Sequence, residues 1–180
     1  MENIGKFALN LKVKLIVTIL EIPRYRDYKK VAFYTVQIEG RELDEFSDFR
    51  QRMKKELVAP SELVEMLAFI TNVGDNWGFR QKDFRDEERA HRFLLPIETH
   101  SIANSKYGLR LYCIVLSPEI VVIMNGGLKT EQNVKNCRNC YQHFLLANRV
   151  ALSLERAMGD KMIELDGFYI EQEHDFLLEV

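Results

Sequence analysis

The sequence predicts a single α+β domain in which helices cover an antiparallel sheet. Segments with apolar residues at alternate positions, which is typical of strands, follow one another with short links, and short links favour antiparallel pairing. Helical spacing of apolar residues appears between and after these strands, which is the α+β order rather than strict strand–helix alternation. With 180 residues and a 47% hydrophobic share, the chain has enough apolar material for one sizeable core.

Two strands are predicted near the start of the chain. Residues 11–20 alternate apolar side chains with Lys12 and Lys14, and Pro23 ends this pattern. Residues 24–30 form a basic connection that contains two tyrosines. A second strand is expected at 31–39, which is rich in β-branched and aromatic residues.

A helix hairpin follows these strands. The first helix is expected at 41–57 and the second at 62–73, separated by Pro60. In the first, acidic residues come early and Lys54 and Lys55 come late, which suits the helix dipole. The apolar stripe of the first helix comprises Leu43, Phe46, Phe49 and Met53.

The second half predicts three strands and one long helix. The polar residues 75–90 are expected to form a loop that runs into a strand at 91–97. Gly126 and Gly127 are interpreted as the end of the third strand. The remaining expected elements are strands at 109–116 and 119–124, a helix at 132–158 and an acidic tail at 161–180.

Overall charge argues against a protein that coats nucleic acid unspecifically. Lys and Arg number 25 and Asp and Glu 27, a formal charge of -2. Residues 161–180 contain one Lys and six acidic residues, so the preceding part is mildly basic and a local basic site is compatible with the total. An odd count of three cysteines gives no disulfide framework and favours a reducing, cytoplasmic environment. The longest apolar run is too short to cross a membrane.

A first group of chemically capable residues lies on the last two predicted strands. Arg110 and Tyr112 occupy alternate positions and therefore share one face of the sheet, and Lys129 follows the next strand just beyond a glycine pair. Two cations and a phenol at one end of a sheet suit a phosphate-rich substrate. The alternative is a half-exposed edge face that merely tolerates Arg and Tyr.

A second group lies in residues 79–92, where Arg80, Arg85 and Arg92 are interleaved with aromatic residues. Such a pattern can contact a nucleic-acid backbone and stack its bases. Acidic residues between these arginines also fit a solvated, salt-bridged loop. His91 is a general acid or base by residue type, although a surface histidine is the commoner state.

A third group is Cys137, Cys140 and His143, with two residues between successive members. The residue types suit zinc, but all three fall in a predicted helix and a fourth ligand is missing nearby. A redox interpretation lacks the βαβ pattern that usually accompanies it. Buried core thiols are therefore the favoured interpretation, and neither a metal nor a cofactor is predicted.

Residues 31–158 resemble the RelE/ParE-like toxin superfamily of bacterial toxin–antitoxin systems. The order of elements is similar, and residues 108–112 (GLRLY) are similar to the glycine–x–arginine–leucine strand of that family. Residues 121–130 (VVIMNGGLKT) resemble its apolar strand with a basic end, and residues 148–151 resemble part of its last helix. Residues 1–30 and 161–180 are then extensions of a RelE-like core.

The resemblance implies a ribosome-dependent mRNA endoribonuclease in which a ribose 2′-hydroxyl attacks the adjacent phosphate. Arg110 would clamp the phosphate and Lys129 would be a second cation or a proton-transfer partner. Tyr112 would position a base. The expected RNA contacts are Arg80, Arg85 and Arg92.

The implied partners are mRNA on the ribosome and a cognate antitoxin. An acidic antitoxin segment is expected at residues 80–92, and the chain's own acidic tail is a second candidate for that position. Thr130, Glu131 and Gln132 stand where many nucleases of the family carry further basic residues. That departure favours the alternative of a non-catalytic toxin that binds gyrase or another protein. An unrelated interaction module is the third interpretation.

Overall fold

The central sheet has six strands in the order β2-β3-β8-β7-β6-β5. The computed structural model describes residues 19–56, 61–94, 108–172 and 178–180. All neighbouring strands pair antiparallel except β3 and β8, which are parallel, so the prediction of a purely antiparallel sheet is wrong at that pair. The strands are β2 (Arg24–Arg26), β3 (Ala32–Tyr34), β5 (Phe84–Glu87), β6 (Ala90–Phe93), β7 (Leu109–Ser117) and β8 (Ile120–Leu128).

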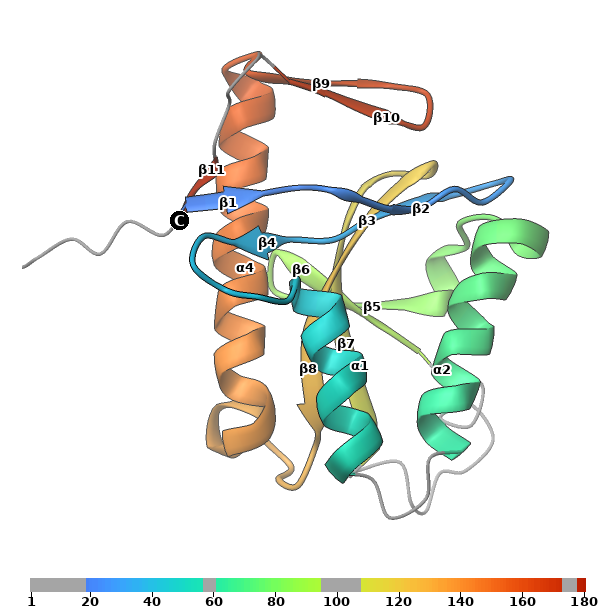
Figure 1. The fold of residues 1–180 in the computed structure, drawn as a ribbon, viewed down its shortest axis with the longest axis vertical. Helices are drawn as coiled ribbons and strands as arrows, with labels where there is room; N and C mark the ends of the chain where they lie inside the picture. The colour runs from blue at the N-terminus through green and yellow to red at the C-terminus, as the bar shows by residue number, and fades with distance from the viewer. Residues whose placement is uncertain (1–18, 57–60, 95–107, 173–177) are drawn as a thin grey trace, which may run out of the picture.

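Helices cover both faces of this sheet (Figure 1). On one face lie α1 (Glu45–Glu56) and α2 (Ser61–Asn72), and on the other lies α4 (Arg138–Gly159). The side chains of β7 alternate between the two helical layers. Leu111 and Cys113 are buried with the side chains of α1 and α2, whereas Tyr112 and Ile114 are buried with those of α4. The α+β class and the helix hairpin are therefore confirmed.

Two small sheets lie beside the central one. In the first, β1 (Ile19–Glu21) pairs with both β4 (Gln37–Ile38) and β11 (Leu178–Glu179). The second is the hairpin of β9 (Ile163–Asp166) and β10 (Tyr169–Gln172). The predicted strand at 31–39 is thus divided between two sheets. The predicted strand at 11–20 lies outside the described residues except for its last two positions.

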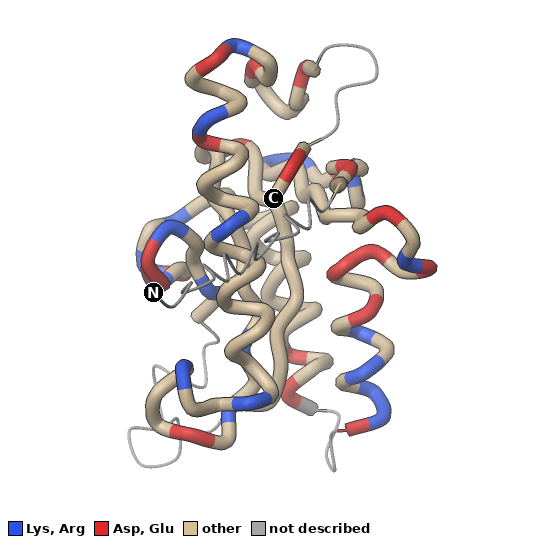
Figure 2. The backbone as a smooth tube through the Cα atoms, turned by 90° about the vertical axis from the view of Figure 1, so that its left-hand side faces the viewer, with Lys and Arg blue, Asp and Glu red and all other residues tan. Residues whose placement is uncertain are grey.

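The acidic tail contains ordered structure in its described part. Its residues form β9 and β10, and β11 pairs with β1 and contacts α4. Strands β9 and β10 pair with each other, and β11 pairs with β1. The described part of the tail therefore does not pair with the basic residues 80–92, where its negative charge had suggested that it would bind. Lys and Arg are interspersed with Asp and Glu along most of the chain (Figure 2).

Residues 84–93 form a hairpin where a loop was expected before the strand. The turn depends on Glu88, which has a φ of 65°. Such turns usually carry Gly at the position of positive φ, so Glu88 does not signal a turn by residue type. Instead, Asn148 of α4 accepts hydrogen bonds from the backbone N–H groups of Arg89 and Ala90 at 2.7 and 2.9 Å. A salt bridge of 2.5 Å joins Arg89 to Glu155 of the same helix.

Gly126 and Gly127 lie inside β8 and do not end it. A Cβ on Gly126 would lie 1.9 Å from the carbonyl oxygen of Arg110, and one on Gly127 would lie 2.4 Å from that of Asn139. The glycines therefore permit close packing of β8 against β7 and against the start of α4. The helix itself begins at Arg138, six residues later than predicted, after a 3₁₀ turn at Val134–Asn136.

No helix in the described part of the chain combines the length and apolarity needed to span a membrane.

Candidate anion-binding pocket

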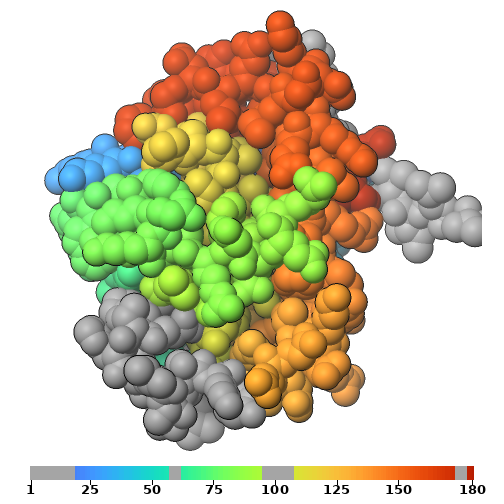
Figure 3. All heavy atoms as spheres, turned by 180° about the vertical axis from the view of Figure 1, so that it is seen from behind, coloured from blue at the N-terminus to red at the C-terminus, as the bar shows by residue number. Residues whose placement is uncertain are grey.

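A polar depression of the surface lies between the β5–β6 hairpin and the connection from β8 to α4. Its volume is about 620 Å³. Figure 3 shows the hairpin and this connection side by side on one face of the molecule. The pocket is lined by Arg85, Glu87, Arg92, Lys129, Glu131, Gln132, Asn133, Val134 and Asn136.

Strand register explains why the cations converge. Arg85 pairs with Arg92, and Arg92 pairs with Tyr112 on the next strand. Residues that pair across neighbouring antiparallel strands share a face of the sheet, so all three lie on the face that α4 covers. Lys129 reaches the same place because its backbone N–H donates to the carbonyl of Gly108, at the start of β7, at 3.1 Å.

Lys129 lies in a positive field. Burial lowers the pKa of its ammonium group, and the charges of Arg110 and Arg92 lower it further, while Glu87 acts in the opposite direction. Arg92 is 6% exposed and Arg110 is 5% exposed. Glu87 accepts a hydrogen bond of 2.9 Å from the Nε of Arg92, which fixes the direction of that guanidinium. An anion in the pocket would relieve the mutual repulsion of these cations.

The structure thus brings together four of the six residues that the sequence analysis selected. Arg85, Arg92 and Lys129 line the pocket, and Arg110 lies close enough to Lys129 to affect its pKa. Arg80 is placed elsewhere: it forms a salt bridge of 2.5 Å with Asp83, and its guanidinium lies 4.2 Å from the centre of the Trp77 ring.

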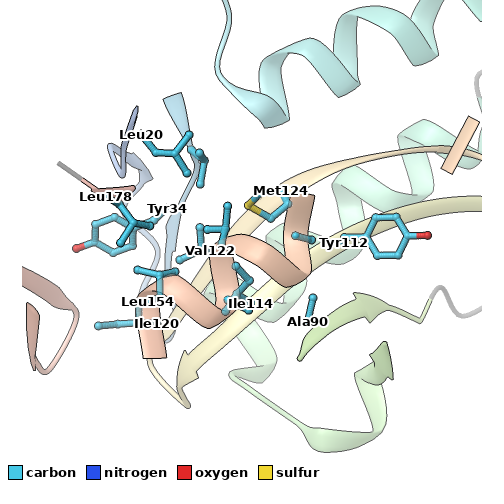
Figure 4. Packing of buried hydrophobic residues seen from close by; sticks show 14 of the residues in the cluster. Leu20, Tyr34, Ala90, Tyr112, Ile114, Ile120, Val122, Met124, Leu154 and Leu178 are labelled. Carbon is cyan, nitrogen blue, oxygen red and sulfur yellow. The ribbon is translucent and has the colours of Figure 1, made fainter. Parts of the chain in front are cut away.

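Tyr112 is a core residue and is only 1% exposed. Its ring packs against Phe144 with a centroid distance of 6.0 Å. Figure 4 shows the ring at one end of the buried cluster, with the hydroxyl directed away from the other labelled side chains. Burial raises the pKa of this phenol. A base could stack on Tyr112 only after the side chain had left this position.

His91 does not line the pocket. It lies 3.5 Å from a carboxylate oxygen of Asp86, and burial lowers its pKa while Asp86 opposes that change. Two pocket features were missed by sequence reasoning, namely Glu87 and the support of the hairpin by Asn148. The residues around Glu87 and Asn148 in the sequence give no indication of these roles, because each side chain acts through a contact with a residue on another element.

A second polar cluster joins α1 to α4 across β8. The Arg52 guanidinium donates to Asn125 at 2.6 Å and to the Gly126 carbonyl at 2.7 Å, and it lies 3.2 Å from His143 Nε2. Asn125 in turn donates to Asp48 at 2.9 Å. Burial lowers the pKa of His143 to about 4, and Arg52 adds to that effect. This cluster ties the two helical layers together and does not line the pocket.

The cysteines are buried and free, as predicted. Within the described residues, no group of three or more His, Cys, Asp and Glu side chains is arranged to hold a metal ion.

Comparison of the chain with protein-family models, with curated proteins and with solved structures gives no match.

Proposed function

We propose that this chain is a toxin of the RelE/ParE-like type that binds an RNA phosphodiester in the pocket and cleaves mRNA on the ribosome. The observation that carries the proposal is the convergence of Arg85, Arg92 and Lys129 on one depression, with Arg110 close enough to Lys129 to affect its pKa. Guanidinium forks bind phosphate oxygens in pairs, and an ammonium group adds a compact charge. The cluster suits a ligand with several phosphate oxygens.

Chain connectivity also supports this proposal. From β3 to α4 the order is strand, helix hairpin, antiparallel strands and helix, as in the family that the sequence resembles. The additional pieces are β2, β5, the β1–β4–β11 sheet and the β9–β10 hairpin.

The proposed reaction relies on charge stabilisation. Arg85 and Arg92 bind the scissile phosphate, and Lys129 neutralises the charge that builds up as the 2′-hydroxyl attacks phosphorus. The 2′-hydroxyl loses its proton and its oxygen forms a bond to phosphorus, while the bond from phosphorus to the 5′-oxygen breaks and that oxygen takes up a proton. The products are a 2′,3′-cyclic phosphate and a 5′-hydroxyl. Because the pKa of Lys129 is lowered, this group gives up a proton more readily than an ordinary lysine.

Expression in a bacterium tests the proposal. We expect the unmodified chain to arrest growth and to cut translated mRNA, and the double variant Arg85→Ala, Lys129→Ala to do neither. The matched control is Lys54→Ala, Lys55→Ala, which also removes two cations but at exposed positions of α1. A harmless unmodified chain that leaves mRNA intact would refute the proposal.

A non-catalytic toxin is the second candidate, since Glu87 and Glu131 line the pocket beside the cations and a mixed lining suits a protein surface. In that case growth arrest occurs with intact mRNA and survives the loss of Arg85 and Lys129. For either function, a cognate antitoxin with an acidic segment is the proposed partner, and the pocket is its proposed binding site.

A further inference from the structure

Cys137 and Cys140 lie at the start of α4, next in sequence to the connection that lines the pocket. Cys137 is the N-cap residue, with extended backbone angles (φ −86°, ψ 99°), and Cys140 lies in the first turn. The backbone N–H of Cys140 donates to the carbonyl of Cys137 at 3.1 Å, which closes that turn. Cys137 therefore stands outside the helix, unlike the helical position that its spacing predicted.

Both sulfurs have polar surroundings. Cys137 and Cys140 lie close enough for each thiol to shift the pKa of the other. The Cys137 sulfur accepts a hydrogen bond from the backbone N–H of Thr130 at 3.4 Å and lies 3.7 Å from the Thr130 hydroxyl oxygen. The Cys140 sulfur lies 3.5 Å from the carbonyl oxygen of Gly127. Apolar core thiols lack donors of this kind.

These contacts make the two thiols chemically unequal. Burial by itself would raise the pKa of Cys137, but hydrogen bonds from Thr130, Cys140 and Glu131 stabilise its thiolate and bring the pKa to about 7. Burial and the neighbouring Cys137 raise the pKa of Cys140 to about 12. A cysteine that is partly ionised to the thiolate near neutral pH, beside a second cysteine that stays protonated, is the arrangement of a nucleophilic and a resolving cysteine.

Cys137 is buried among residues that are themselves exposed. Its side chain is fully buried, yet every residue from 129 to 136 and both residues that follow Cys137 are partly or fully exposed. A reagent therefore reaches the sulfur only when this connection is displaced. Cys113, in contrast, is buried in the central sheet against the side chains of α1 and α2, and burial raises its pKa well above the usual value.

We propose that Cys137 and Cys140 are a redox-active dithiol that reacts with low-molecular-weight disulfides and closes to an intramolecular disulfide. The Cys137 thiolate attacks one sulfur of the external disulfide and releases the first thiolate. The Cys140 thiol then loses its proton and attacks the Cys137 sulfur, which releases the second thiolate. Two electrons pass from the protein to the external disulfide, two protons are released by the protein thiols overall, and two small thiols form.

The test uses the reduced full-length chain. It is incubated with glutathione disulfide at pH 7, unreacted thiols are blocked by alkylation, and the cysteines are mapped by mass spectrometry. We expect a bond between Cys137 and Cys140 with Cys113 alkylated in the final denaturing step. In the native protein, Cys137 should react at least about tenfold faster than Cys113, with a rate that rises around pH 7.

Two variants check the order of events. Cys140→Ser should stop at a mixed disulfide between glutathione and Cys137, and Cys137→Ser should leave Cys140 unmodified. Cys113→Ser should react as the unmodified chain does. Persistence of both thiols of the unmodified chain in glutathione disulfide, or equal reaction at Cys113, would overturn the proposal and identify the pair as structural thiols. Since these measurements involve neither RNA nor growth, their failure is distinct from failure of the proposed function.

Discussion

The backbone of Arg110 and the Cα of Gly126 are so close that no side chain fits between them. A Cβ on Gly126 would lie 1.9 Å from the carbonyl oxygen of Arg110. The contact lies next to an irregular step in the β7–β8 pairing, which falls between Leu111 and Cys113. Because Lys129 directly follows β8, the close approach of these strands helps to set the position of Lys129 relative to Arg110.

We therefore expect Gly126→Ala to destabilise the protein by about 1–3 kcal/mol, since the strands must separate to admit a methyl group. The free energy of unfolding from urea denaturation measures the effect. Gly159→Ala is the matched control because its Cβ would meet nothing within 4 Å. Equal effects of the two changes would show that the backbone at Gly126 adapts freely.

Much of this region follows from sequence, and the exceptions have identifiable physical causes. Alternation placed Arg110 and Tyr112 on one face correctly, because sheet periodicity is local. The exposure of Tyr112 was not predictable from alternation, because it depends on α4, which covers that face. Likewise, a glycine pair predicts a strand end from sequence, since only the neighbouring backbones of β7 and α4 reveal why side chains are excluded there.

Arg80 and Arg85 should behave differently, although sequence reasoning grouped them. Arg85→Ala should weaken binding of a single-stranded RNA and make the dependence of affinity on salt less steep, because one phosphate contact is lost. Arg80→Ala should leave affinity unchanged, because Arg80 is engaged by Asp83 and Trp77. Fluorescence anisotropy at several salt concentrations measures both. A larger loss for Arg80→Ala would move the binding surface away from the pocket.

Anion binding should be coupled to proton uptake at alkaline pH. The pKa of Lys129 is lowered by burial, Arg110 and Arg92, and a bound phosphate would oppose that field and raise it. We expect calorimetric titration with a phosphate-containing ligand to show net proton uptake that is larger at alkaline pH than at pH 7. Lys129→Met should abolish the uptake; its persistence in that variant would assign the proton to another group.

The free energy of unfolding should fall as the pH decreases from about 6.5 to about 4. His143 has a pKa of about 4 in the folded protein, so the unfolded chain binds its proton at higher pH than the native state does. At roughly 1.4 kcal/mol per pKa unit, the loss is a few kcal/mol at most. Protonation of His143 is opposed first by burial and then by the charges of Arg52, which faces Nε2, and of Arg41, while Asp48 favours it.

Urea denaturation of the unmodified chain and of His143→Gln at pH 7 and pH 5 measures this contribution. The variant should lose less stability between these two pH values. The contribution of Glu45 to the free energy of unfolding changes with pH in the opposite direction, because burial raises the pKa of its carboxyl group. Since Glu45 is present in both proteins, it does not affect their comparison. An identical pH dependence in the two proteins would exclude His143 as the source.

Asn148 should determine how firmly the β5–β6 hairpin is held. Asn148→Ala removes the acceptor for two backbone N–H groups, at a cost of about 1–3 kcal/mol for donors left unsatisfied. Amide hydrogen exchange at Arg89 and Ala90 should accelerate while that of β8 is unchanged. Gln142→Ala, at an exposed position of the same helix, is the control. Unchanged exchange at the hairpin would mean that Glu155 alone holds it.

The parallel pairing of β3 with β8 has a consequence for the order of folding. Phe33 pairs with Val121, so the closing contact of the sheet joins residues 88 positions apart in sequence, and the helix hairpin lies within that loop. The pairs β5–β6 and β7–β8, in contrast, are local hairpins. Contacts between residues far apart in sequence form slowly, because closing the long loop between them costs conformational entropy before the contact stabilises the chain. The strands around Lys129 should therefore acquire protection early in refolding, and β3 should join them in the rate-limiting step.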